Sequence, residues 1–309
     1  MTMTAEAGTD LVEGVLPRSP AGLGVLAGYW ALTKPDINLL IGITVFVGFC
    51  LGRPTASSSF PVGLLINSLL GTMLVAGGSG ALNQYIERQF DAQMRRTARR
   101  PLASGKVEPH HVLCFGILLS GIGVLYLAFL VNMLASLIAI ATLICYLALY
   151  TPLKRKTPLC TLVGAFPGAT PPLIGWAAAS GRLSSDAWIL YAMLFLWQFP
   201  HFMAIAWMYR DDYDRAGYLV LPRGKGASRF LAWQSLLPLV VLIPLTLIPT
   251  LIGYAGLTYA GAALFLNCGF LYWAVRLILE KTNFVARRLL TASIIYLPVI
   301  LLIMLLDKT

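Results

Sequence analysis

The chain has 309 residues, of which 58% are hydrophobic and only 12% are charged, whereas soluble domains carry about 25% charged residues. This composition excludes an ordinary soluble domain and predicts an all-α protein that crosses a membrane many times. The net charge of +10 is compatible with nucleic-acid binding by its size alone, but the distribution of the basic residues argues against that partner.

Residues 1–28 contain acidic residues, glycine and proline and show little periodicity. We expect them to form a flexible cytosolic tail, and residues 29–309 to form a single transmembrane domain. The apolar segments that follow are long enough to cross a bilayer as helices, which takes about 20 residues each. The predicted fold is therefore a bundle of about nine helices, near residues 36–52, 61–91, 111–130, 133–151, 158–179, 186–209, 230–251, 256–279 and 288–306.

Three prolines interrupt the fifth predicted span, at Pro167, Pro171 and Pro172. Proline removes a backbone hydrogen bond inside a helix and clashes with the preceding turn. We therefore expect a kink in this span.

The orientation follows from lysine and arginine, which are more frequent in cytosolic loops. If the N-terminus is cytosolic, only Arg53, Arg182 and Lys308 of the 23 basic residues lie on the outer side. An odd number of spans then places the C-terminus outside. The basic charge belongs to a membrane face, so we expect the lipid bilayer as a partner and no nucleic acid.

The second span ends in the most informative motif of the chain. Asn83, Glu87 and Asp91 are four residues apart, so on a helix they line one face as a ladder of oxygen ligands. Mg²⁺ prefers such ligands and commonly combines one or two carboxylates with substrate phosphates. A solvated helix end would also explain these residues. In either case we expect Asp91 at the surface, with little part in packing.

Two more even-numbered spans end in polar motifs on the same predicted face. The fourth ends in Tyr150–Lys156, and the sixth ends in Tyr209–Arg215. Carboxylates alone would repel a diphosphate, whereas metal ions between them, with lysine and arginine nearby, would bind it. Together the three helix ends predict one site for a metal-bridged diphosphate. Taken singly, each is also explained as a topology signal or a solvated helix end.

These motifs resemble those of the UbiA-type intramembrane prenyltransferases. Asn83–Asp91, followed by Arg95-Arg96-Thr97, resembles their first acidic motif, and Tyr150–Arg155 resembles their tyrosine–lysine motif. More narrowly, Leu196-Trp-Gln-Phe-Pro-His-Phe202 and Tyr209-Arg-Asp-Asp-Tyr213 resemble the protohaem IX farnesyltransferase branch. The resemblance extends over about residues 28–300.

The resemblance implies transfer of a farnesyl group from farnesyl diphosphate to a vinyl group of protohaem IX (haem b), giving haem O for haem A biosynthesis. It implies Mg²⁺ as the cofactor, with haem b as a substrate, and a bacterial inner (plasma) membrane with the active site on the cytosolic side. A haem A synthase or terminal oxidase would be an assembly partner. The alternatives are a UbiA-type enzyme acting on an aromatic or quinone precursor, and a membrane transporter, which would need acidic residues in the middle of its spans.

The resemblance also implies roles for individual residues. Asn83, Glu87 and Asp91 would hold one metal ion and Asp211 and Asp212 a second, while Lys154, Tyr150 and Arg95 would act in catalysis, and Arg88, Arg96, Arg155, Arg210, His201 and Tyr85 would bind substrate. The second acidic motif departs from a four-spaced aspartate pair, which leaves the number of its ligands open.

His201 is expected inside the sixth span, about 15 Å from Asp211 along a straight helix. An ionisable group within a span is a functional candidate, and imidazole binds haem iron. Haem contact and a hydrogen bond to a neighbouring helix are both consistent with this position. His110 and His111, in the loop before the third span, are expected at the membrane interface.

Overall fold

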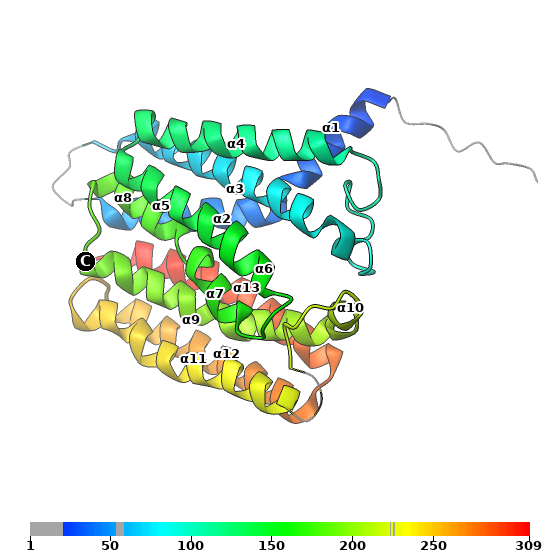
Figure 1. The fold of residues 1–309 in the computed structure, drawn as a ribbon. Coiled ribbons are helices and arrows are strands. Elements are labelled where there is room, and N and C mark those ends of the chain that lie inside the picture. Colours follow the sequence, from blue (N-terminus) through cyan, green and yellow to red (C-terminus); the bar gives the residue numbers. More distant parts are fainter. Residues whose placement is uncertain (1–20, 54–58, 223, 225) are drawn as a thin grey trace, which may run out of the picture.

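The computed structural model describes residues 21–309 except 54–58, 223 and 225. Figure 1 shows the long helices side by side in one bundle, with α10 at the end opposite the C-terminus. The helical elements, in order, are α1 (Ala21–Leu32), α2 (Pro35–Gly52), α3 (Val62–Asp91), α4 (Pro109–Leu130), α5 (Met133–Ile144), η1 (Cys145–Tyr150), α6 (Thr151–Leu153), α7 (Cys160–Gly168), α8 (Pro171–Ser180), α9 (Ser185–Met208), α10 (Arg210–Arg215), α11 (Gly226–Leu251), α12 (Leu257–Glu280) and α13 (Asn283–Leu306).

Within the described residues, eight helical segments are long and apolar enough to cross a membrane. They are α2, α3, α4, the continuous α5–η1–α6 segment, α9, α11, α12 and α13. The predicted all-α membrane bundle is confirmed, and the count of nine holds only as an approximation. The difference lies in the fifth predicted span.

The expected fifth span is two short helices, α7 and α8, separated at Ala169 and Thr170. Pro171 and Pro172 occupy the first turn of α8, where the missing N–H groups do not break the helix ladder. The Thr170 hydroxyl donates to the Pro167 carbonyl at 2.7 Å, which satisfies a backbone group that the break leaves free. The predicted kink is therefore a complete interruption.

Glycines bring two helix pairs into close contact. A Cβ on Gly175 of α8 would lie 2.1 Å from the Val45 carbonyl oxygen of α2, and one on Gly78 of α3 would lie 2.2 Å from the Ser120 hydroxyl of α4. Helices in a membrane pack through small residues because lipid gives no hydrophobic drive for their association. These contacts hold α2 and α3, which lead into the site, against their neighbours.

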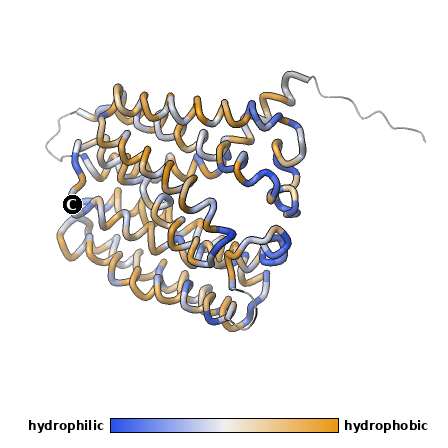
Figure 2. Tube along the Cα trace, in the orientation of Figure 1, coloured by the Kyte–Doolittle hydropathy of each residue, from blue (hydrophilic) through white to orange (hydrophobic). Residues whose placement is uncertain are grey.

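Large apolar side chains cover the outside of the bundle as well as its core. Tyr259, Phe270 and Met193 are buried between α9, α11, α12 and α13, whereas Phe129 and Phe265 point outward and are exposed. An extensive exposed apolar surface suits contact with lipid. Figure 2 shows the hydrophilic residues concentrated in the loops and at α10, at one end of the helices.

Helix α1 begins at Ala21, so residues 21–28 of the expected irregular tail are helical. The remaining residues of that predicted tail, 1–20, lie outside the described part of the chain.

Candidate active site

The ladder Asn83–Glu87–Asp91 lies on the last turns of α3, on one face as its spacing predicts. The three residues are buried, with exposed fractions of 1%, 5% and 1%. Asp91 is therefore not the surface residue expected from the sequence. Buried carboxylates and amides are costly unless they are paired, so their partners define the site.

A different cationic side chain binds each member of the ladder. The pairs are Lys34 Nζ with Asn83 Oδ1 at 2.8 Å, Lys154 Nζ with Glu87 Oε1 at 2.8 Å, and Arg100 Nη1 with Asp91 Oδ2 at 2.7 Å. The cations come from the start of α2, the end of α6 and the loop after α3. The result is a buried row in which each oxygen side chain of α3 is paired with a lysine or arginine from another part of the chain.

Lys34 is a member of this row that sequence analysis missed. It directly precedes α2 with φ 54° and ψ 64°, a left-handed conformation that costs a non-glycine residue roughly 1–2 kcal/mol. Burial lowers the pKa of Lys34 below its ordinary value. A lysine placed before a helix-starting proline, in the sequence Thr33-Lys34-Pro35, was the available signal.

Lys154 and Tyr150 meet the ladder as predicted. Burial alone would lower the pKa of Lys154, but Tyr150 and the Glu87 carboxylate hold it well above its ordinary value, so the ammonium stays charged. Its Nζ lies 4.6 Å from the centre of the Tyr150 ring, a cation–π contact. Tyr150 ends the π-helical turn η1, a type of turn that is frequent at functional sites.

Two contacts, one at a glycine and one at a threonine, position this tyrosine–lysine motif. A Cβ on Gly164 of α7 would lie 2.5 Å from the Tyr150 ring, so only glycine leaves room for the ring there. The Thr151 hydroxyl accepts a hydrogen bond from Asn83 Nδ2 at 3.2 Å. The start of α6 is therefore tied directly to the ladder on α3.

The second acidic motif reaches the same end of the bundle through Asp212. Its Oδ2 accepts from the backbone N–H of Arg96 at 3.2 Å, and its Oδ1 lies 3.3 Å from Arg215 Nη1. Asp212 is buried. Its bond to Arg96 joins α10 to the loop after α3, and this part of the predicted arrangement is present in the structure.

Asp211 points elsewhere. Its side chain is 82% exposed and lies 3.7 Å from Arg210 Nε. Consecutive residues on a helix are about 100° apart, so Asp211 and Asp212 cannot both face the loop after α3. The structure brings only one of the two predicted ligands of a second metal ion to the site.

The remaining predicted site residues, Arg95 for catalysis and the others for substrate binding, divide into two groups. Arg95, Arg96 and Arg155 are exposed at the ladder end of the bundle, where Arg155 stacks on the ring of Phe90 with 4.1 Å between the guanidinium carbon and the ring centre. These three lie around the site without reaching its buried row.

Tyr85, Arg88 and Arg210 lie away from the ladder. Tyr85 packs with the cluster formed by α1 and α4, and Arg88 Nη1 donates to the Tyr85 carbonyl at 2.8 Å. Arg210 donates to Asn283 of α13 and to the Trp207 carbonyl. His201 lies seven residues before the end of α9, with its Nδ1 2.8 Å from the hydroxyl of Ser293 on α13.

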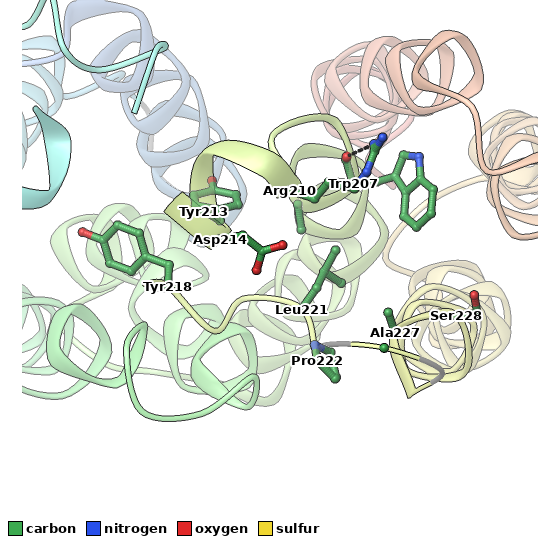
Figure 3. Close-up of a pocket in the computed structure, with 11 residues that line it drawn as sticks. Trp207, Arg210, Tyr213, Asp214, Tyr218, Leu221, Pro222, Ala227 and Ser228 are labelled. Atoms are coloured by element: carbon green, nitrogen blue, oxygen red, sulfur yellow. Dashed lines mark hydrogen bonds between the residues drawn. The ribbon is translucent and has the colours of Figure 1, made fainter. Parts of the chain in front are cut away.

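A cavity of about 300 Å³ lies beside the site, between α9, α10 and the start of α11. Figure 3 shows Tyr218 at one side of it and Trp207 with Arg210 at the other. Tyr218 also packs with Met94 in the loop after α3, so the cavity adjoins the second acidic motif. Burial, together with the Glu87 carboxylate, raises the pKa of Tyr218, which keeps this phenol neutral.

The residues of the ladder fit a hard divalent cation. Asp91 Oδ1 is buried and has no hydrogen-bond partner among the described residues, and the same is true of Gln84 Oε1 two turns earlier. A buried oxygen without a partner carries an uncompensated desolvation cost, which a bound Mg²⁺ would remove. Asn83, Glu87 and Asp91 would supply the oxygen donors.

The fold and the site define a polytopic helical membrane protein with a buried site at one end of its helices, in which an amide and two carboxylates are paired with lysine and arginine. The chain belongs to the UbiA prenyltransferase family, whose family model matches residues 41–296. The resemblance noted from the sequence motifs is thereby confirmed.

Individual relatives agree with this assignment. The chain is 46% identical over 286 residues to the protohaem IX farnesyltransferase of Solibacter usitatus, an alignment that covers 91% of this chain and 98% of that protein. A solved structure of a digeranylgeranylglyceryl phosphate synthase has the same fold, with a TM-score of 0.73, 17% identity and coverage of 91% of this chain and 98% of that one. A UbiA homologue from Archaeoglobus fulgidus bound to GPP and Mg²⁺ has a TM-score of 0.62 at 14% identity, covering 90% of this chain and 99% of that one.

Proposed function

We propose that the protein is a prenyltransferase that joins the farnesyl group of farnesyl diphosphate to a vinyl group of protohaem IX, giving haem O. The observation that carries this proposal is the 46% identity over 98% of the length of a relative named for this activity. The buried row of carboxylates and cations supports it, because a metal-bound diphosphate needs both signs of charge in one place.

The ladder on α3 is the proposed Mg²⁺ site, held by Asn83, Glu87 and Asp91, with Asp212 as the acidic residue of the second motif that is bonded to the loop after α3. The Archaeoglobus homologue, which was solved with GPP and Mg²⁺, supports Mg²⁺ as the ion. When bound, the ion neutralises charge that develops on the departing diphosphate.

The cations of the row would act on the same leaving group. Lys154 and Arg100 carry positive charge into a buried site, where a charge interacts more strongly than in water, and Lys34 Nζ adds hydrogen-bond donors beside Asn83. They stabilise diphosphate oxygens through charge-assisted hydrogen bonds. Because its pKa is held high, Lys154 remains a cation throughout.

The farnesyl carbon that loses the diphosphate becomes an allylic cation, which needs a nearby electron-rich surface and no water. The Tyr150 ring provides such a surface beside Lys154, and a desolvated aromatic face stabilises a cation by about 2 kcal/mol. Tyr85 does not have this role, since it packs against α1 and α4. The vinyl group then forms the new carbon–carbon bond, and water adds to the cation left on the porphyrin side chain, giving a hydroxyl group and releasing a proton.

The site is proposed to face the cytosol of a bacterial plasma membrane, with the N-terminus inside and the C-terminus outside. The loops at the ladder end hold most of the lysine and arginine residues, as cytosolic loops do. A haem A synthase or terminal oxidase as an assembly partner stays a prediction.

The transporter interpretation required carboxylates in the middle of the spans. In the part of the chain that the structure describes, the acidic residues lie at or near helix ends. This placement favours an interfacial enzyme site.

Purified protein incubated with haem b, farnesyl diphosphate and Mg²⁺ tests the proposal. Mass spectrometry of the extracted porphyrins should show haem b gaining a farnesyl group and a hydroxyl group. A parallel reaction with an aromatic acid or quinone precursor should give no product. Absence of the heavier porphyrin at saturating haem b would refute the assignment.

A further inference from the structure

A hydrogen-bonded contact in the middle of the bundle links α9 to α13. His201 Nδ1 lies 2.8 Å from the Ser293 hydroxyl oxygen, and Trp197 Nε1 donates to the Ser293 carbonyl at 2.9 Å. The rings of Trp197 and His201 are stacked, with 4.9 Å between their centres and 27° between their planes. The imidazole is therefore fixed in orientation by two helices.

The proton of the Ser293 hydroxyl determines which nitrogen of His201 is protonated. That hydroxyl donates to the Leu290 carbonyl at 2.7 Å, and a carbonyl can only accept. A serine hydroxyl has one proton to donate, so at the contact with His201 the serine oxygen is the acceptor. The histidine therefore carries its proton on Nδ1, and the lone pair of the neutral ring is on Nε2.

Nε2 is left open by the surrounding chain. No hydrogen bond to this nitrogen forms among the described residues, and the His201 ring is partly exposed although it belongs to a membrane-spanning helix. A ring nitrogen with an unused lone pair in an apolar medium is costly. Histidines that bind metals show the same arrangement, in which the far ring nitrogen donates to a fixed partner and the near one faces the metal.

We propose that His201 Nε2 binds the iron of the haem substrate as an axial ligand, with Ser293 as the positioning residue that fixes the tautomer. This rests on the proposed function, because it requires an iron porphyrin as the acceptor. His201 lies seven residues before the end of α9, about 10 Å along the helix axis. The porphyrin can span that depth, since its vinyl groups stand at the rim of the macrocycle.

The two other histidines of the chain are in a different setting. His110 and His111 are exposed at the start of α4, and their Nδ1 atoms lie 3.4 and 3.9 Å from Glu108 Oε2. They lie in the exposed first turn of α4, at the very end of that span, and not in the loop expected from the sequence. His110 therefore serves as a matched control for loss of a histidine that does not reach the bundle interior.

Ligation is tested with full-length protein in detergent, titrated with ferric haem b in the absence of farnesyl diphosphate and Mg²⁺. Optical and electron paramagnetic resonance spectra of the wild type should show a nitrogen axial ligand. His201→Gly should lose that signature and bind haem b at least ten-fold more weakly, and added imidazole should restore the spectrum. His110→Ala should match the wild type.

Iron-free protoporphyrin IX separates ligation from packing, because it has the same shape without the iron. Its affinity should change less than two-fold in His201→Gly, while equal losses for both porphyrins would overturn the proposal. His201→Gln, which keeps a polar group near Ser293, should give the same loss of the spectrum if the glycine variant does not fold. Retention of the wild-type spectrum by either variant would also overturn it.

Ser293→Ala tests the positioning role. Removal of the acceptor leaves the Nδ1 proton without a partner, so haem b should bind about 10-fold more weakly with the nitrogen signature retained. An unchanged affinity would remove Ser293 from the proposal. Failure of the proposed function is seen separately, as a wild type that binds haem b with the nitrogen signature but forms no farnesylated product.

Discussion

At the scale of single residues, the site consists of oxygen side chains on α3 that are paired with lysine and arginine side chains from elsewhere in the chain. Asn83, Glu87 and Asp91 follow from a spacing of four that any helix would place on one face. Their partners could not be read in the same way, because Lys34 Nζ reaches Asn83 from 49 residues away and Lys154 Nζ reaches Glu87 from 67 residues away. Such pairs are decided by how helices pack.

A comparison of Lys34 with Lys281 separates two effects of substitution by glycine: loss of a side chain from the site and relief of backbone strain. Both have left-handed backbones, with φ of 54° and 52°, and only Lys34 contacts the ladder. Lys34→Gly should lower product formation at least ten-fold with little change in melting temperature. The strain relieved, about 1–2 kcal/mol, offsets the hydrogen bond lost, about 1 kcal/mol.

Lys281→Gly is the control for this substitution. It should raise the melting temperature in detergent and keep wild-type turnover. Equal turnover of the two glycine variants would show that Lys34 has no part in the reaction.

The neighbouring aspartates of α10 give a second comparison at this scale. Asp212 is buried against the loop after α3, whereas Asp211 is exposed. Asp212→Asn should reduce turnover at least ten-fold more than Asp211→Asn, because only the former removes charge from the site. Steady-state assays at several Mg²⁺ concentrations measure the difference. A larger effect at Asp211 would mean that α10 turns when substrate binds.

At the scale of helices, the long apolar segments predicted most spans correctly. The fifth predicted span is not a single helix, and prolines mark the place where it is broken. Pro171 and Pro172 suit the start of a new helix better than the middle of one. The break also places α7 so that Gly164 faces the Tyr150 ring. Sequence analysis predicted a kink here, and the two-helix solution depends on Thr170, which bonds the freed carbonyl of Pro167.

The close helix contact at Gly175 can be tested with Gly261 as the control, because Gly261 has free space around it. A Cβ at Gly175 would meet the backbone of α2 at 2.1 Å, whereas nothing lies within 4 Å of one at Gly261. Gly175→Ala should lower the melting temperature of the purified protein, since α8 must move away from α2. Gly261→Ala should raise it slightly, because alanine is favoured over glycine by about 0.5–1 kcal/mol in a helix. If both variants have the same melting temperature, the close contact at Gly175 does not contribute to the stability of the protein.

At the scale of the whole molecule, the site exists because helices that are distant in sequence end at one face of the bundle. Figure 1 shows α6 and α10 at the same end as the C-terminal turns of α3. Nearly all the basic residues were assigned to this side from the positive-inside rule. The segments around Asp91, Lys154 and Asp212 come together through packing of the bundle, and no local pattern reports that contact.

Ligand binding at this shared end should stabilise the whole bundle. Farnesyl diphosphate and Mg²⁺ added together, without haem, should raise the melting temperature of the wild type by several degrees, because a ligand at 100 times its Kd adds about 2.7 kcal/mol. Chelation of the ion should cancel the shift. Glu87→Gln should not respond, and an equal shift in that variant would place the metal elsewhere.

The sequence by itself determined the class of protein, the positions of most spans, the ladder on α3 and the family, because these depend on composition and on the regular repeat of a helix. Tertiary structure alone decided that Lys34 joins the site, that Asp212 and not Asp211 reaches it, that Tyr85 and Arg88 do not, and that Asp91 is buried. The reason is physical. Which side of a helix end meets its neighbour depends on the packing and rotation of whole helices, and long-range contacts of that kind leave no periodic signal in the chain.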